Sequence, residues 1–258
     1  MTKLSIVITG STRGIGRGLA MEFLKRGHQV ILNGRNAIVV EGIVKKLISQ
    51  GYDALGVPGD VREESTFQSI EEQALSKYGT IDIWINNAGI PQSHKLFHEL
   101  DSEEIRSLVA VNITGLMLGT KAAIEIFQQQ GHGLVLNMEG FGSDGRMLKK
   151  LSLYGTSKRA VQYFSKAVSK EVKGTGIRVG ILSPGMVKTD FLTDSATRGD
   201  QAEQRRTQRI FDILAEDPEV VTAFLARKIL RSSKPYDRIV FLTPWRLFPK
   251  ILRLMFVR

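Results

Sequence analysis

The sequence contains no cysteine among its 258 residues. Disulfide bonds, thiolate catalysis and cysteine-based metal sites are therefore excluded, we assign no residue to a metal, and a reducing compartment fits this composition. No uninterrupted run of about 18 apolar residues occurs, so we expect no transmembrane helix. The start, Met1–Leu4, lacks the features of a signal peptide, which leads us to expect a cytoplasmic location.

Acidic side chains are scarce relative to basic ones: 26 Asp and Glu face 36 Lys and Arg, which gives a net charge of +10. This excess is compatible with phosphate-rich cofactors, nucleic acid or anionic membranes. The cations are spread along the chain and no recognition motif is visible, so we expect no nucleic-acid partner. Hydrophobic residues make up 42% of the chain, enough for a sizeable core.

The first motif is a strand, a glycine turn and a helix in close succession. Residues 4–9 are short and β-branched, as a buried strand requires, and residues 17–25 favour a helix. This order begins a dinucleotide-binding βαβ unit, in which glycines allow the turn, the approach of a pyrophosphate and close helix packing. The turn predicts seven cofactor-binding residues: Gly10, Ser11, Thr12, Arg13, Gly14, Ile15 and Gly16.

No carboxylate follows the second predicted strand, residues 28–33. A carboxylate there would accept hydrogen bonds from the ribose diol of NAD. Arg35 takes this place, between Asn33 and Asn36, and Arg13 lies in the glycine turn. Guanidinium groups bind phosphate in a bidentate manner, so these residues predict a ribose 2′-phosphate and NADP(H). The alternative is that both arginines are solvated surface side chains.

The remaining chain alternates between strand and helix patterns. We expect strands at 54–57, 81–85, 134–138, 177–182 and 238–242, and helices at 37–50, 63–78, 101–128, 154–173 and from 217 onwards. The alternation predicts an α/β fold: a single domain over residues 1–258 with a Rossmann-type, doubly wound sheet of about seven parallel strands and helices on both faces.

Small and polar residues follow several strands at the edge where such sheets bind ligands. Asp60 and Val61 follow the third strand. The turn Asn86–Gly89 follows the fourth, and its composition suits a backbone that passes close to a flat ring system, although a plain Asn/Gly turn explains it equally well. Both segments are candidates for cofactor binding.

A long helix is predicted to start at Asp101, where Asp101 and Glu104 have the spacing of a capping box. Asn112 interrupts the apolar face of this helix. A buried amide competes with the backbone and needs a hydrogen-bond partner. Asn112 is therefore a candidate for a role beyond packing.

Tyr154 and Lys158 are one helical turn apart and share a face of their predicted helix. A neighbouring ammonium favours phenolate and lowers the pKa of a phenol. Such a pair suits the reduction of a carbonyl, whose oxygen needs a proton when the carbon receives hydride. The alternative is a chance pair, since Tyr and Lys four residues apart occur on many helices.

Two late segments depart from the alternation. Residues 186–215 are polar and fit either a mobile lid over the substrate or a long surface connection. The tail, residues 244–258, is apolar and basic, as an interfacial membrane helix is. The tail equally fits a segment that packs onto the body of the protein or onto a neighbouring subunit.

Taken together, the motifs resemble the short-chain dehydrogenase/reductase family over about residues 4–189. The resemblance implies that Tyr154 is the general acid, that Lys158 lowers its pKa and holds the nicotinamide ribose, and that Asn112 maintains a proton relay. It also implies a homo-oligomer. Further cofactor contacts follow from it: Asp60 at the adenine, Asn87, Ala88 and Gly89 along the cleft, Thr189 at the carboxamide, and Val61, Pro184, Gly185 and Val187 nearby.

The chain departs from the family pattern after the fifth strand. Family members usually have two serines there, the second of which orients the substrate carbonyl. This chain has Glu139 and Gly140 instead, and the nearest hydroxyl belongs to Ser143, which we take as the catalytic candidate.

The unusual loop resembles the chlorophyll b reductase group of the family over about residues 137–247. The resemblance is in residues 137–143, the Tyr154–Lys158 helix, residues 183–190, and residues 242–244 with the apolar basic tail that follows them. This resemblance implies an NADPH-dependent reductase of a bulky hydrophobic aldehyde or ketone, such as the 7-formyl group of chlorophyll b. The alternative from another class is an NADP(H)-binding sensor or scaffold protein with little turnover.

Overall fold

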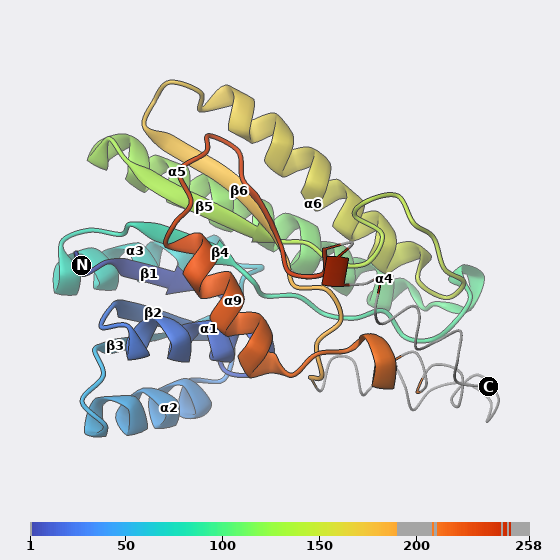
Figure 1. Cartoon of the computed structure of the whole chain (residues 1–258), viewed down its shortest axis with the longest axis horizontal. Helices are drawn as coiled ribbons and strands as arrows, with labels where there is room; N and C mark the ends of the chain where they lie inside the picture. Colours follow the sequence, from blue (N-terminus) through green and yellow to red (C-terminus); the bar gives the residue numbers. More distant parts are fainter. Residues whose placement is uncertain (1, 190–207, 209–210, 244, 247, 249–258) are drawn as a thin grey trace.

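The computed structural model describes residues 2–189, 208, 211–243, 245–246 and 248. Seven parallel strands form one sheet in the order β3-β2-β1-β4-β5-β6-β7 (Figure 1). The order reverses between β1 and β4, which opens a crevice at the carboxyl ends of these strands. The strands are β1 (Ser5–Ile8), β2 (Gln29–Gly34), β3 (Ala54–Pro58), β4 (Ile83–Asn86), β5 (Gly133–Met138), β6 (Ile177–Ser183) and β7 (Arg238–Val240).

Helices cover both faces of the sheet, as the sequence predicts (Figure 1). Successive side chains of a strand point to opposite faces, so Ile6 and Ile8 join one buried cluster and Val7 joins the other. The helices are α1 (Gly14–Lys25), α2 (Ala37–Ser49), α3 (Glu64–Tyr78), α4 (Ser102–Val109), α5 (Leu116–Gln130), α6 (Ser152–Glu171) and α9 (Pro218–Ile229), with a 3-10 turn η1 (Phe97–Glu99) and a π-helical turn η2 (Ala110–Gly115).

The predicted helix from Asp101 is divided into α4, η2 and α5. Asp101 caps it as expected, since its carboxylate accepts a hydrogen bond from the Glu104 amide at 2.7 Å. The predicted capping box is wrong: the Glu104 carboxylate binds the amide and hydroxyl of Ser93 at 2.6 and 2.7 Å. By length and composition residues 102–130 are apolar enough to cross a membrane, but α5 packs its buried face on β4 and β5.

Most of the predicted lid and tail lie outside the described residues. Val187 forms a parallel β-bridge with Glu216, so both ends of the intervening segment are held together. In the tail, the Arg246 guanidinium lies 4.5 and 4.3 Å from the ring centroids of Phe224 and Phe241. Trp245 is exposed.

A buried polar network joins the ends of β4 and β5 to the helices behind them. The Asn86 amide donates to Thr120 Oγ1 at 3.1 Å and to Asn137 Oδ1 at 2.9 Å. The Asn137 amide donates to Ser165 Oγ at 2.9 Å. Trp84 Nε1 completes the network with a 2.9 Å bond to Asn86 Oδ1. Because these groups are withdrawn from water, each depends on its partner.

We expect Asn137→Ala to lower the free energy of unfolding by about 1–3 kcal/mol, because the Asn86 amide and the Ser165 hydroxyl lose a buried partner. Urea unfolding measures this as a lower midpoint with an unchanged slope. The control is Gln128→Ala, which removes an exposed amide from α5. Equal midpoints for the two variants would contradict the prediction.

Candidate active site

The glycine turn after β1 lies against the turn after β4. Gly10 has φ +62°, and a Cβ atom at this position would lie 2.8 Å from Ala88 Cα. Thr9 Oγ1 accepts hydrogen bonds from the Asn87 and Ala88 amides at 3.0 and 3.1 Å. Asn87 Nδ2 donates back to the Thr9 and Gly10 carbonyls. Only glycine at position 10 permits this approach.

The first turn of α1 fits a pyrophosphate. The helix has no acidic residue in this turn, and Arg13 makes no side-chain capping bond. Its first backbone bond runs from the Arg17 amide to the Arg13 carbonyl, so the amides of Gly14, Ile15 and Gly16 have no helical acceptor. Amides and the helix dipole together attract an anion. Thr189 lies over this turn: its Cγ2 is 3.6 Å from a Cβ placed on Gly14.

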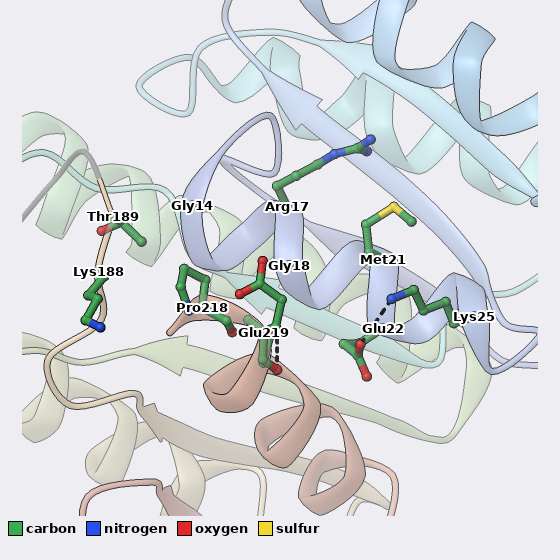
Figure 2. A pocket seen from close by; sticks show the side chains of 11 residues that line it. Gly14, Arg17, Gly18, Met21, Glu22, Lys25, Lys188, Thr189, Pro218 and Glu219 are labelled. Atoms are coloured by element: carbon green, nitrogen blue, oxygen red, sulfur yellow. Dashed lines mark hydrogen bonds and ion pairs between the residues drawn. The ribbon is translucent and has the colours of Figure 1, made fainter. Parts of the chain in front are cut away.

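A cavity of about 400 Å3 opens beside this turn (Figure 2). Gly14 and Thr189 belong both to this cavity and to the predicted cofactor site. Its other walls come from the outer face of α1, the start of α9 and Lys188, for which the sequence indicated no site. They are Arg17, Gly18, Met21, Glu22, Lys25, Lys188, Pro218, Glu219 and Thr222.

The two predicted phosphate-binding arginines lie at one edge of the crevice. A Cβ on Gly34 would lie 2.6 Å from Thr12 Cγ2, so the glycine turn contacts the end of β2. Arg13 and Arg35 are the next residues along each segment, and both are exposed. Their guanidinium groups are therefore available to an anion at this edge.

The side chains of several predicted cofactor-binding residues already have hydrogen-bond partners within the protein. Asn33 Nδ2 donates to the Val57 and Gly59 carbonyls. Ser11 Oγ and the backbone of Asn33 bond each other, and Asn36 caps α2. Asp60 pairs with Arg62. The hydrogen bonds from Arg62 are the largest cause that lowers the pKa of the Asp60 carboxyl. Val61, Pro184 and Val187 are buried, and Gly185 turns the chain with φ +74°.

Asn112 and Lys158 converge on Gly89. Asn112 Oδ1 and Lys158 Nζ lie 3.3 and 3.7 Å from a Cβ placed on Gly89. The Asn112 amide has the partner that the sequence requires, because it bonds the Ile90 amide at 2.8 Å and the Ile90 carbonyl at 2.9 Å. Lys158 is buried and donates to the Met138 carbonyl at 3.1 Å. Its Nζ is 5.7 Å from the ring centroid of Tyr154.

Burial controls the protonation of the Tyr154–Lys158 pair. It raises the pKa of Tyr154, which is opposite to the direction expected from a neighbouring cation. Burial also lowers the pKa of Lys158 to about 8, although the negative charge of Glu139 acts in the other direction. The expected cation effect on the phenol is therefore outweighed by desolvation of both groups.

Gly140 contacts the Tyr154 hydroxyl where the family serine is expected. A Cβ on Gly140 would overlap that hydroxyl, so a serine does not fit without a shift. Ser143 is buried in the following turn, where its amide donates to the Gly140 carbonyl at 3.2 Å. Its own carbonyl accepts a bond from Arg159 at 2.8 Å. The contact with the phenol thus belongs to Gly140, and the role of Ser143 stays a prediction.

Two features of the site were not predicted. The side chain of Glu139 is fully buried and binds Arg238 of β7 at 2.7 Å. Gln92 is also buried and binds the backbone amide of Tyr154 at 3.0 Å. Neither has a local sequence signal, because the partners are 99 and 62 residues apart. Among the described residues no cluster of His, Cys, Asp and Glu could hold a metal ion.

Sequence comparisons identify relatives with named activities. The family model of short chain dehydrogenases matches residues 5–199. The rice protein "Chlorophyll(ide) b reductase NOL, chloroplastic" is 36% identical over 259 residues, which cover 96% of this chain and 74% of the relative. The protein of the same name from Arabidopsis thaliana is also 36% identical, over 96% of this chain and 72% of its own length.

Solved structures share the fold and contain nicotinamide cofactors. An actinorhodin polyketide ketoreductase with NADPH has a TM-score of 0.81 and 25% identity, and the match covers 95% of this chain and 97% of that one. A 3-ketoacyl-(acyl-carrier-protein) reductase from Brucella melitensis with NADH has a TM-score of 0.78 and 28% identity, over 92% and 96%. The chain therefore belongs to the short-chain dehydrogenase family of oxidoreductases, which bind a nicotinamide cofactor, and is similar to chlorophyll(ide) b reductases.

Proposed function

We propose that this protein is an NADPH-dependent reductase that converts the carbonyl of a bulky hydrophobic substrate to an alcohol. The observation that supports this most is the convergence of Asn112 and Lys158 on Gly89, with Tyr154 beside Lys158, at the end of the nucleotide crevice. This convergence supports a proton donor at the end of the crevice where the reducing cofactor would end.

The chemistry needs a hydride and a proton. NADPH, when bound, supplies the hydride to the carbonyl carbon. Tyr154 donates its proton to the carbonyl oxygen, and burial supports this role because a raised pKa keeps the phenol protonated. The ammonium of Lys158 stabilises the phenolate that remains. Ser143 is the candidate to orient the carbonyl, since Gly140 has no side chain.

NADPH is preferred over NADH in this proposal because of Arg13 and Arg35. The contact of Thr12 with Gly34 and the exposure of the next residues, Arg13 and Arg35, support this choice, because a ribose 2′-phosphate is expected at this edge. The carboxylate of Asp60, nearby, is already paired with Arg62. The actinorhodin ketoreductase contains NADPH, which supports this choice, whereas the Brucella melitensis reductase contains NADH. The cofactor preference is therefore tested directly below.

A hydrophobic substrate is supported by the apolar surroundings of Tyr154. Tyr154 packs against a buried cluster of Leu100, Leu108 and Leu153, as Ile90 and Ile105 also do. The similarity to chlorophyll(ide) b reductases makes the 7-formyl group of chlorophyll b the first aldehyde to test.

The direct test is a panel of aldehydes, ketones, quinones and chlorophyll b with NADPH. We expect the wild type to reduce the formyl group and Tyr154→Phe to lose about 10²–10⁴-fold in rate, because the phenol is the general acid. The control is Tyr163→Phe, which alters an exposed tyrosine of the same helix. If the wild type binds NADPH but oxidises no NADPH with any compound of the panel, the proposed reductase activity is refuted. The alternative, a sensor or scaffold protein that binds NADP(H), then takes its place.

Removal of the arginines should reduce the preference for NADPH. We expect Arg35→Ala to weaken NADPH binding about tenfold or more, because a charge-assisted bond contributes about 1.5–3 kcal/mol, and to leave NADH binding unchanged. Arg13→Ala should behave alike. Fluorescence titration with each cofactor measures the two dissociation constants. The control is Arg26→Ala, which removes an arginine that pairs with Glu22. Tighter binding of NADH by the wild type would refute the preference.

The rate should depend on the charge of Lys158. Its pKa of about 8 lies below the usual value, so the cation is present below pH 8 and is lost above it. At saturating NADPH we expect the reduction rate to fall as the pH rises through about 8. In Lys158→Arg the guanidinium stays protonated, so the relative rate should stay level to pH 10. A wild-type profile that is level to pH 10 would contradict this assignment.

A further inference from the structure

The catalytic helix α6 begins without a cap of its own. Its N-cap residue is Leu151, which makes no side-chain capping bond. Tyr154 is the third residue of the helix, so its amide is one of the four that lack a helical acceptor. A partner for this amide must come from elsewhere in the chain.

Gln92 supplies that partner from the loop after β4. Its side-chain oxygen accepts the Tyr154 amide proton at 3.0 Å, and the residue is 3% exposed. Its Nε2 donates to the Lys95 carbonyl at 3.4 Å, which fixes the orientation of the side chain. A buried glutamine thus caps the helix that contains the proposed acid.

The loop that contains Gln92 is held on both sides. Before it, Asn112 binds the amide and the carbonyl of Ile90. After it, the Glu104 carboxylate binds the amide and hydroxyl of Ser93 at 2.6 and 2.7 Å. The position of Gln92 is therefore fixed by its own loop, so its bond to the Tyr154 amide can hold the first turn of α6 in place.

The carbonyl of Tyr154 is fixed as well. Ser157 Oγ donates to it at 2.7 Å, and Asn112 Nδ2 donates to Ser157 Oγ at 3.3 Å. Both backbone groups of the proposed acid are thus bound by side chains. The Tyr154 hydroxyl meanwhile lies against Gly140. Displacements near 1 Å can lower a rate about 10²-fold.

We propose that Gln92 is a positioning residue for Tyr154: it ties the loop at the nucleotide crevice to the first turn of α6 and so sets the place of the phenol. This inference rests on the proposed function of Tyr154 as the acid. It assigns a specific task to Gln92, in the loop between β4 and α4.

The test uses Gln92→Met, which keeps the length of the side chain and removes the acceptor, and Gln92→Glu, which keeps an acceptor oxygen at the positive end of the helix. With NADPH and the aldehyde of the panel that reacts fastest, we expect Gln92→Met to lower kcat about 10–100-fold while the Kd for NADPH stays within twofold. We expect Gln92→Glu to recover at least half of that loss on a logarithmic scale. Gln92→Ala is used instead if Gln92→Met prevents folding, and Gln68→Met on the exposed side of α3 is the matched control.

Amide hydrogen exchange gives a readout that does not depend on turnover. Exchange in the peptide over residues 151–158 should be faster in Gln92→Met and near the wild-type rate in Gln92→Glu. The inference would be overturned by a wild-type kcat in Gln92→Met, or by a kcat in Gln92→Glu that is no higher than in Gln92→Met. Inactivity of Gln92→Met beside a fully active Tyr154→Phe would overturn the proposed function instead.

Discussion

The site depends on the close contact between the glycine turn after β1 and the turn after β4. Gly10 and Ala88 approach so closely that no side chain fits between them, and Thr9 and Asn87 hold the two turns together by four hydrogen bonds. One side of this contact presents the free amides of α1. The other side leads directly to Gly89, Ile90 and Gln92, so the same contact that shapes the cofactor crevice also fixes the loop that caps α6.

Glu139 and Gly140 together replace the two expected serines by a different arrangement. Gly140 makes room for the Tyr154 hydroxyl, whereas Glu139 turns away and pairs with Arg238. Such a pair adds little net stability, but loss of one partner leaves a buried charge and is costly. The pair therefore constrains β7 and the β5 loop to one arrangement, and its carboxylate also acts on Lys158 through space.

The sequence was sufficient for the sheet, because strands 5–8, 29–34 and 177–183 are apolar and end in glycine or serine turns. The glycine turn and the Tyr154–Lys158 pair were found for the same reason: their spacing is local. The prediction of a capping box was wrong because the Glu104 carboxylate bonds Ser93, in a loop eleven residues earlier. Gln92 could not have been found, since a glutamine in a loop has no preferred partner until the fold is known.

The least predictable property was the direction of the pKa of Tyr154. From the sequence, an ammonium one turn away should dominate. In the fold, Lys158 directs its proton to the Met138 carbonyl, and both groups lose solvation. Desolvation keeps the phenol protonated, as the proposed role of general acid requires. It also makes Lys158 a cation with few compensating contacts, so negative charge that would develop on Tyr154 in the proposed proton transfer is attracted more strongly than it would be in water.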